Sequence, residues 1–79
     1  MKELFIIVRH VHVEVNHKVV TEYYEHIIKD PEEFIKWHLN RFDATRFTVY
    51  QSCVDEITSM LRHQTPHIVY QIEKIFTIL

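Results

Sequence analysis

The chain has 79 residues, a formal net charge of −2 at pH 7 and one cysteine, Cys53. This length allows a single domain over residues 1–79, and one cysteine excludes an intramolecular disulfide, which indicates a reducing, cytoplasmic location. The charge argues against a dedicated nucleic-acid binder, which is usually strongly basic. The opening run is too short and too soon charged for a signal peptide or a membrane span, so we expect no membrane association.

The stretch from Leu4 to Val15 is the most apolar and most β-branched run of the chain. Its second half alternates apolar and polar residues, which is typical of a half-buried strand, so we predict a strand over about residues 3–15. Its first half, Leu4–Val8, is apolar at every position and needs cover on both faces, unless a β-bulge near Arg9 brings the apolar side chains to one side. The run also fits a helical stripe, which leaves an all-α bundle as the alternative fold.

Between residues 17 and 29, apolar residues recur in adjacent pairs every four positions, which places them on one face of a helix. A return strand over Val19–Ile28 is the alternative. Asp30, Pro31 and Glu33 then resemble a helix start, with aspartate as cap, proline at the first helical position and glutamate at the third. We therefore predict helices over about residues 17–29 and 31–42.

Asp43 fits a third cap, and the apolar residues that follow step by three and four along a helical seam. The seam consists of Phe47, Tyr50, Val54, Ile57 and Leu61. It predicts a helix over about residues 44–63, and Thr65 with Pro66 predicts a last helix over 66–79. The last segment is also β-branched and alternating, and as a strand it would be the natural partner of Leu4–Val15. The predicted fold class is helix-dominated α+β: one N-terminal strand followed by three or four helices.

Seven histidines raise the question of a metal site, because imidazole is the commonest metal ligand. Their spacing matches no metal-binding motif, so we predict no metal ligands and no cofactor. Cys53 lies on the predicted apolar seam, where we expect a small buried hydrophobe rather than a nucleophile. No catalytic motif occurs, and we predict no catalytic residues and no enzymatic activity.

Aromatic residues are abundant for a chain of this length, and a small domain has too little interior to bury all of them. We expect a protein interface that includes these aromatic residues and the strand valines. The predicted interface residues are Trp37, Tyr23, Tyr24, Val11, Val13 and Val15. A lone strand leaves both edges unpaired, so we expect a homodimer, in which Val13→Lys would abolish folding or dimerisation.

Together these features predict a small regulatory or inhibitory protein that acts by binding another protein. The sequence has no glycine and a single alanine, Ala44, a composition that resembles AT-rich phage reading frames and suggests a host protein as the target. The alternative is a dimeric nucleic-acid-binding regulator that uses the paired N-terminal strand or a helix. The acidic balance of charge counts against this alternative.

Overall fold

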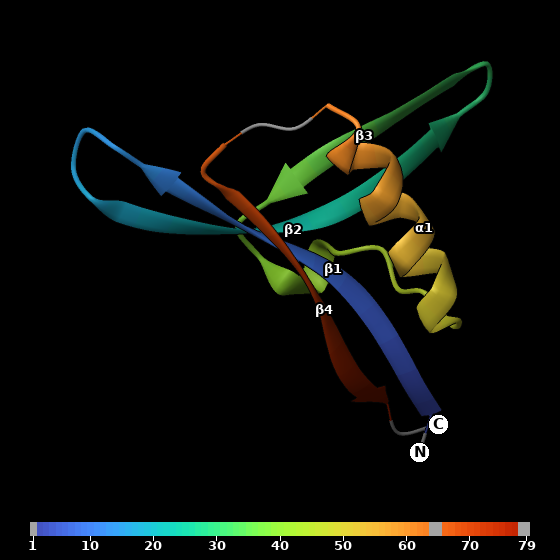
Figure 1. Ribbon diagram of the computed structural model, residues 1–79. Helices are drawn as coiled ribbons and strands as arrows, with labels where there is room; N and C mark the ends of the chain where they lie inside the picture. The colour runs from blue at the N-terminus through green and yellow to red at the C-terminus, as the bar shows by residue number, and fades with distance from the viewer. Residues whose placement is uncertain (1, 64–65, 78–79) are drawn as a thin grey trace.

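The computed structural model describes residues 2–63 and 66–77 (Figure 1). The described residues form a four-stranded antiparallel sheet in the order β3-β2-β1-β4. The strands are β1 (Lys2–Val13), β2 (Lys18–Lys29), β3 (Glu32–His38) and β4 (Ile68–Thr77). A short 3₁₀ helix, η1 (Arg41–Asp43), and an α-helix, α1 (Tyr50–Leu61), lie between β3 and β4 in the sequence.

The predicted helix-dominated α+β fold is wrong, and so is the all-α alternative, because strands hold most of the described residues. The predicted helix over 17–29 is β2, the helix over 31–42 is mainly β3, and the described part of 66–79 is mainly β4. The helix over 44–63 is shortened to α1. The predicted strand over 3–15 is confirmed by β1, and the alternatives of a return strand over 19–28 and of a final strand paired with the first are also confirmed.

The misassigned β2 shows why apolar pairs every four residues were ambiguous. Adjacent residues of a strand point to opposite faces, so paired apolar residues suit a strand that is covered on both sides. Tyr23 contacts the core on one face of the sheet, and Tyr24 is fully buried in the core on the other. The Asp30–Pro31 peptide is cis and forms the turn in which Lys29 faces Glu32, because aspartate and proline favour turns as well as helix starts.

Strand β1 is the centre of the sheet and is paired along both edges. Its register with β4 is continuous from Lys2 to Val11, so the β-bulge considered near Arg9 does not form. Consequently Ile6 and Val8 point to one face while Ile7 points to the other, and all three are buried. The predicted need for cover on both faces of Leu4–Val8 is therefore confirmed.

The cover on both faces comes from one continuous stretch of chain. On one face Ala44, directly after η1, packs against Ile6 and Val8. On the other face Cys53 of α1 packs against Ile7 and Tyr24, with six partly buried apolar residues around them. The stretch from η1 to α1 must therefore pass from one face of the sheet to the other.

The passage lies in a split between β1 and β2. These strands are paired from Val8 opposite Tyr23 out to the hairpin, and they separate in the other direction. In the gap, the Phe47 N–H donates to the Phe5 carbonyl and the Phe5 N–H donates to the Phe47 carbonyl, both at 2.8 Å. The Thr45 N–H donates to the Tyr24 carbonyl, also at 2.8 Å. Residues 44–49 thus satisfy backbone groups of both strands while they cross the sheet.

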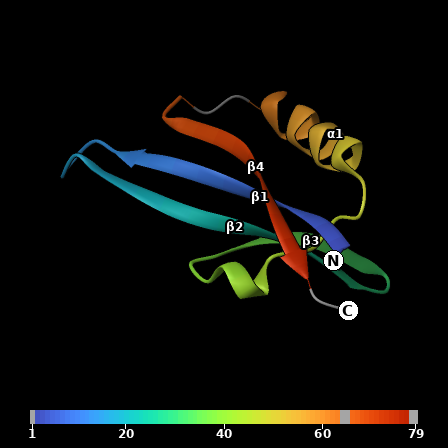
Figure 2. The same ribbon diagram turned by 90° about the horizontal axis from the view of Figure 1, so that it is seen from below.

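The split gives the molecule two projecting hairpins (Figures 1 and 2). The hairpin of β1 and β2 extends beyond α1 on one side, and the hairpin of β2 and β3 extends on the other. At the β1–β2 turn, the Asn16 carboxamide oxygen accepts from the Lys18 N–H at 3.2 Å, so Asn16 supports a turn rather than a helix start.

Candidate functional site

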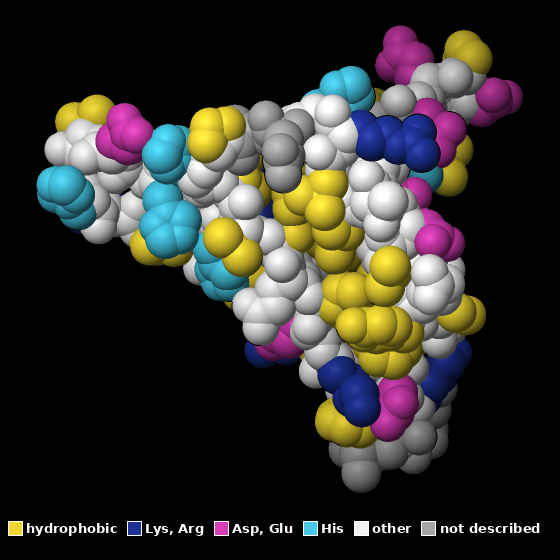
Figure 3. Space-filling model, in the orientation of Figure 1, with side chains coloured by type: hydrophobic (Ala, Val, Ile, Leu, Met, Phe, Trp, Pro, Cys, Tyr) yellow, Lys and Arg dark blue, Asp and Glu magenta, His cyan; other side chains and the backbone are white. Residues whose placement is uncertain are grey.

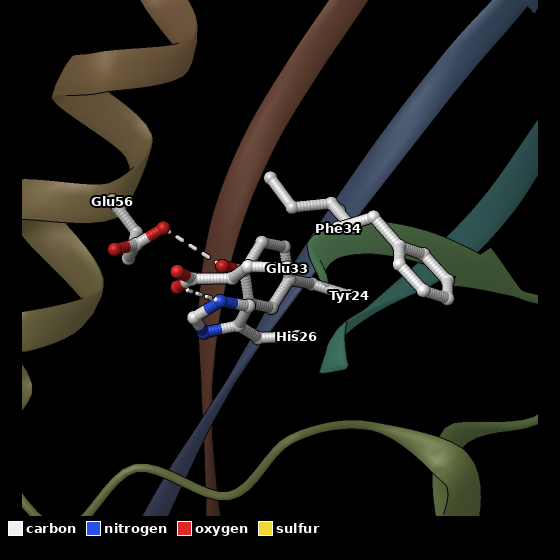
Figure 4. Close-up of a pocket in the computed structure, with 6 residues that line it drawn as sticks. Tyr24, His26, Glu33, Phe34 and Glu56 are labelled. Carbon is white, nitrogen blue, oxygen red and sulfur yellow. Dashed lines mark hydrogen bonds and ion pairs between the residues drawn. The ribbon is translucent and has the colours of Figure 1, made fainter. Parts of the chain in front are cut away.

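A polar pocket of about 280 Å³ lies where the β2–β3 hairpin meets α1 (Figure 4). Strand β2 contributes Tyr24 and His26, β3 contributes Glu33, and α1 contributes Glu56. The Tyr24 hydroxyl donates to Glu56 Oε2 at 2.7 Å, and His26 Nε2 forms an ion pair with Glu33 Oε1. Sheet pairing and helix packing therefore bring together residues from three elements.

The pocket has an excess of acceptors over donors. Burial, and then the neighbouring Glu56, raise the pKa of Tyr24 above its ordinary range, so its hydroxyl stays protonated and acts as a donor. Two carboxylates face one imidazole, and within the described residues no lysine or arginine forms an ion pair with Glu33 or Glu56. The arrangement is suited to receive a cationic group.

Exposed apolar side chains lie on the same face of the β2–β3 hairpin as this pocket. Ile28 is 70% exposed although it shares a face of the hairpin with His26 and Glu33. Ile35 stands directly opposite His26 across the pair of strands and is also exposed. Exposed apolar side chains that gather on one surface mark candidate protein-binding sites.

A second hollow, an apolar groove of about 350 Å³, lies between α1 and β4. Its walls include Tyr50, Val54 and Leu61 from the helix and Tyr70 and Ile72 from the strand. Figure 3 shows hydrophobic side chains gathered along the line between these two elements. Strand β4 is an edge strand, so the groove borders backbone groups that no described strand pairs.

The structure separates the predicted interface residues into three environments. Tyr24 is fully buried and offers no surface of its own, whereas Trp37 and Tyr23 are half-buried. The Trp37 ring packs edge-on against Tyr24 at 5.6 Å and lies 3.9 Å from the Arg9 guanidinium carbon. The three valines lie on the β1–β2 hairpin: Val11 and Val13 are half-buried and Val15 is 95% exposed at the turn.

Several histidines gather on the β1–β2 hairpin and the neighbouring start of β4 (Figure 3). Both ring nitrogens of His10 have partners, Thr21 Oγ1 at 3.1 Å and Gln71 Oε1 at 3.0 Å, and His67 pairs with Glu14 at 2.9 Å. Across residues 2–63 and 66–77, no three His, Cys, Asp or Glu side chains are grouped to hold a metal ion.

Cys53 is fully buried in the core, as its position on the apolar seam predicted. Burial, with a smaller contribution from Glu56, raises the pKa of its thiol to about 11. A nucleophilic cysteine requires the opposite shift, so Cys53 acts as a small core residue.

Sequence reasoning missed His26, Glu33 and Glu56 as partners, because it placed all three on separate helices. One feature of the sequence could have predicted the contact between His26 and Glu33, namely the alternative return strand over Val19–Ile28. With a turn at Asp30 and Pro31, that strand brings His26 within two residues of the position opposite Glu33. Glu56 carries no such local signal, since only the packing of α1 on the sheet brings it to Tyr24.

Comparisons with protein-family models, with curated proteins and with solved structures found no match. Among the described residues, no helix is long and apolar enough to span a membrane.

Proposed function

We propose that this chain is a small non-enzymatic protein that acts by binding another protein, and that the polar pocket receives a lysine or arginine side chain of that partner. The observation that carries the proposal is the pair of carboxylates, Glu33 and Glu56, that line one pocket and form no ion pair with a lysine or arginine among the described residues. The pocket supplies one imidazole, His26, which pairs with Glu33, and one hydroxyl, Tyr24, which donates to Glu56. Charge-assisted hydrogen bonds to carboxylates are the stronger kind, and arginine is enriched at the centres of protein interfaces.

The surroundings support a protein partner over a small cation. A bare ion gains nothing from Ile28 and Ile35, whereas a basic residue within an apolar segment would cover both while its charged end enters the pocket. The Tyr24 hydroxyl holds Glu56 at one side of the pocket, so one carboxylate is positioned before binding.

The test is an NMR titration of the chain with the blocked peptide Ile-Arg-Ile. We expect resonances of Tyr24 and His26 to shift saturably with peptide, and the affinity to fall with added salt because the contact is between charges. The double variant Glu33→Gln and Glu56→Gln should weaken binding at least tenfold.

The matched controls change charge without changing the pocket. Asp55→Asn removes a carboxylate from the exposed side of α1 next to Glu56, where Asp55 accepts a hydrogen bond from Gln51, and should leave the affinity unchanged. The peptide Ile-Gln-Ile should bind at least tenfold more weakly than Ile-Arg-Ile. Equal binding of both peptides, or unchanged binding by the double variant, would overturn the proposal.

We also propose that the chain acts as a homodimer. The reason given by the sequence, an unpaired N-terminal strand, does not apply, because β1 is paired on both sides. The support now comes from β3 and β4, which form the two edges of the described sheet and can accept a further strand. Light scattering at increasing concentration tests this: a mass of two chains is expected, and a mass of one chain throughout would refute it.

A further inference from the structure

The two edges of the sheet differ in how well they could accept another strand. Edge strand β3 has seven residues and carries charges at Glu32, Glu33 and Lys36, a common protection of edges against pairing. Strand β4 has ten residues, and its two charged side chains already have partners inside the chain. Glu73 pairs with Arg41 at 3.0 Å, and Lys74 pairs with Glu3 at 3.6 Å.

We infer that β4 pairs antiparallel with β4 of a second copy, about a two-fold axis that passes through Ile72, so that two sheets become one. This inference names the interface of the homodimer and rests on that part of the proposed function. Such an axis is perpendicular to the sheet, so the face that carries α1 lies on the same side of the joined sheet in both copies. Residues that stand opposite each other in the joined sheet must point to the same face. Because side chains alternate between faces, the axis must then pass through a residue and not between two residues.

Centring on Ile72 matches side-chain chemistry on both faces. The pairs across the axis are Ile72 with Ile72, Val69 with Ile75, Ile68 with Phe76, Tyr70 with Lys74, and Gln71 with Glu73. Val69 and Phe76 are 54% and 58% exposed in the single chain, and each would gain an apolar neighbour. Directly opposed apolar pairs stabilise antiparallel strands.

The neighbouring registers are worse. Centring on Glu73 or on Lys74 sets two like charges directly opposite each other, which destabilises a pair of strands. Centring on Gln71 places Val69 opposite Glu73 and Ile68 opposite Lys74, so the apolar side chains lose their partners. Only the Ile72 register combines long overlap with apolar pairs and no opposed like charges.

The same symmetry accounts for the apolar groove. Because each face keeps its side, both α1 helices would lie on the same face of the joined sheet, and the two grooves would meet beside the axis. Tyr50 and Leu61, which are exposed on the groove walls at 54% and 45%, would then lose contact with water. The contact involves about a dozen residues per chain, roughly half of a standard interface, so we expect a dimer that dissociates on dilution.

The polar pocket lies at the opposite side of the sheet from β4, between the β2–β3 hairpin and α1. The dimer would therefore leave both pockets open, one on each outer side, and would bind two basic segments at once. Binding at the pocket and dimerisation at β4 involve different residues, so an experiment can refute either one without refuting the other.

The test mixes two variants that each add one cysteine at an exposed or half-exposed β4 position, Gln71→Cys and Glu73→Cys, under mild oxidation. In the Ile72 register these positions face each other across the axis, whereas each position lies diagonal to its own copy at roughly 7–8 Å, too far for a disulfide. The mixture should form a disulfide-linked dimer at least fivefold faster than either variant alone. The native Cys53 is fully buried and does not compete.

Light scattering and circular dichroism of each variant, taken before oxidation, check mass and fold. A two-chain mass with preferential cross-linking in the mixture supports the inference. A two-chain mass with equal or no cross-linking overturns the Ile72 register and leaves the homodimer in place. A one-chain mass of the wild-type protein overturns both, while the peptide titration at the pocket is unaffected.

Discussion

The two halves of β1 differ in how much of their apolar surface is buried. Residues Leu4, Ile6, Ile7 and Val8 are all buried, whereas Val11 and Val13 are half-buried and Val15 is almost fully exposed beyond the end of the strand. Both halves are rich in β-branched residues and both belong to the same central strand. The difference comes from residues 44–49, which cross the sheet beside the first half and bring cover to both of its faces.

This contrast shows that burial in a small sheet is set by what lies over a strand, and apolar sequence alone does not decide it. The first half acts as the core of the molecule, and the second half extends as a two-stranded arm with polar side chains such as His10 and Thr21 bonded along one face. Substitutions in one half only test whether this difference in cover sets the stability of the fold.

The largest effect is expected for Ile7→Ala, because Ile7 is fully buried against Tyr24 and Cys53. The loss of a core isoleucine side chain should lower the free energy of unfolding by about 2–5 kcal/mol, and Ile7→Val should lower it by about 0.5–1.5 kcal/mol. Urea unfolding followed by tryptophan fluorescence measures both. A loss below about 1 kcal/mol for Ile7→Ala would show that this half is not the core.

Alkaline pH should destabilise the same half through Cys53. Burial raises the pKa of this thiol from 9.0 to about 11, so the folded state favours the neutral thiol. The thiol's contribution to the free energy of unfolding is therefore complete below pH 9 and is lost as pH rises through 11. Two pKa units correspond to about 2–3 kcal/mol. The raised pKa of Tyr24 adds a loss in the same direction. Unfolding free energies at pH 8 to 11 should fall less steeply in Cys53→Ala, and equal slopes would contradict the assignment.

Thr45→Val tests the segment that crosses the sheet. The Thr45 hydroxyl accepts from the His26 N–H at 2.8 Å, so valine, which has nearly the same shape, would leave this partly buried donor without a partner. We expect a loss of about 1–3 kcal/mol by urea unfolding. Thr48→Val, at an exposed position nearby, is the control and should change the stability by less than about 0.5 kcal/mol.

The smallest effect is expected for Val13→Lys, which the sequence alone predicted to abolish folding or dimerisation. Val13 is half-buried at the outer end of β1, next to exposed residues, so a lysine there can extend its charged end into water. We expect a loss below about 1 kcal/mol and unchanged light scattering. Loss of folding in this variant would mean that the arm is covered by something that the single chain does not contain.

The central strand could be predicted from the sequence. The alternation in its second half and the continuous apolar run of Leu4–Val8 were enough to predict a strand and the need for cover on both of its faces. It also identified Cys53 as a core residue and most of α1, because the seam from Tyr50 to Leu61 repeats at helical spacing. These features are local. The Leu4–Val15 run also fits a helical stripe, and its β-branched residues favoured the strand.

Strands β2 and β3, in contrast, depend on tertiary contacts that the local sequence does not reveal. Apolar residues in adjacent pairs fit one face of a helix or both faces of a covered strand, and the choice depends on cover supplied by residues 44–49 and α1, far along the chain. Asp30 and Pro31 are equally ambiguous, because this dipeptide can begin a helix or form a turn. The turn forms here because β3 pairs with β2 on its far side. The polar pocket follows from both decisions, because His26, Glu33 and Glu56 meet only after the hairpin has formed and the helix has packed against it.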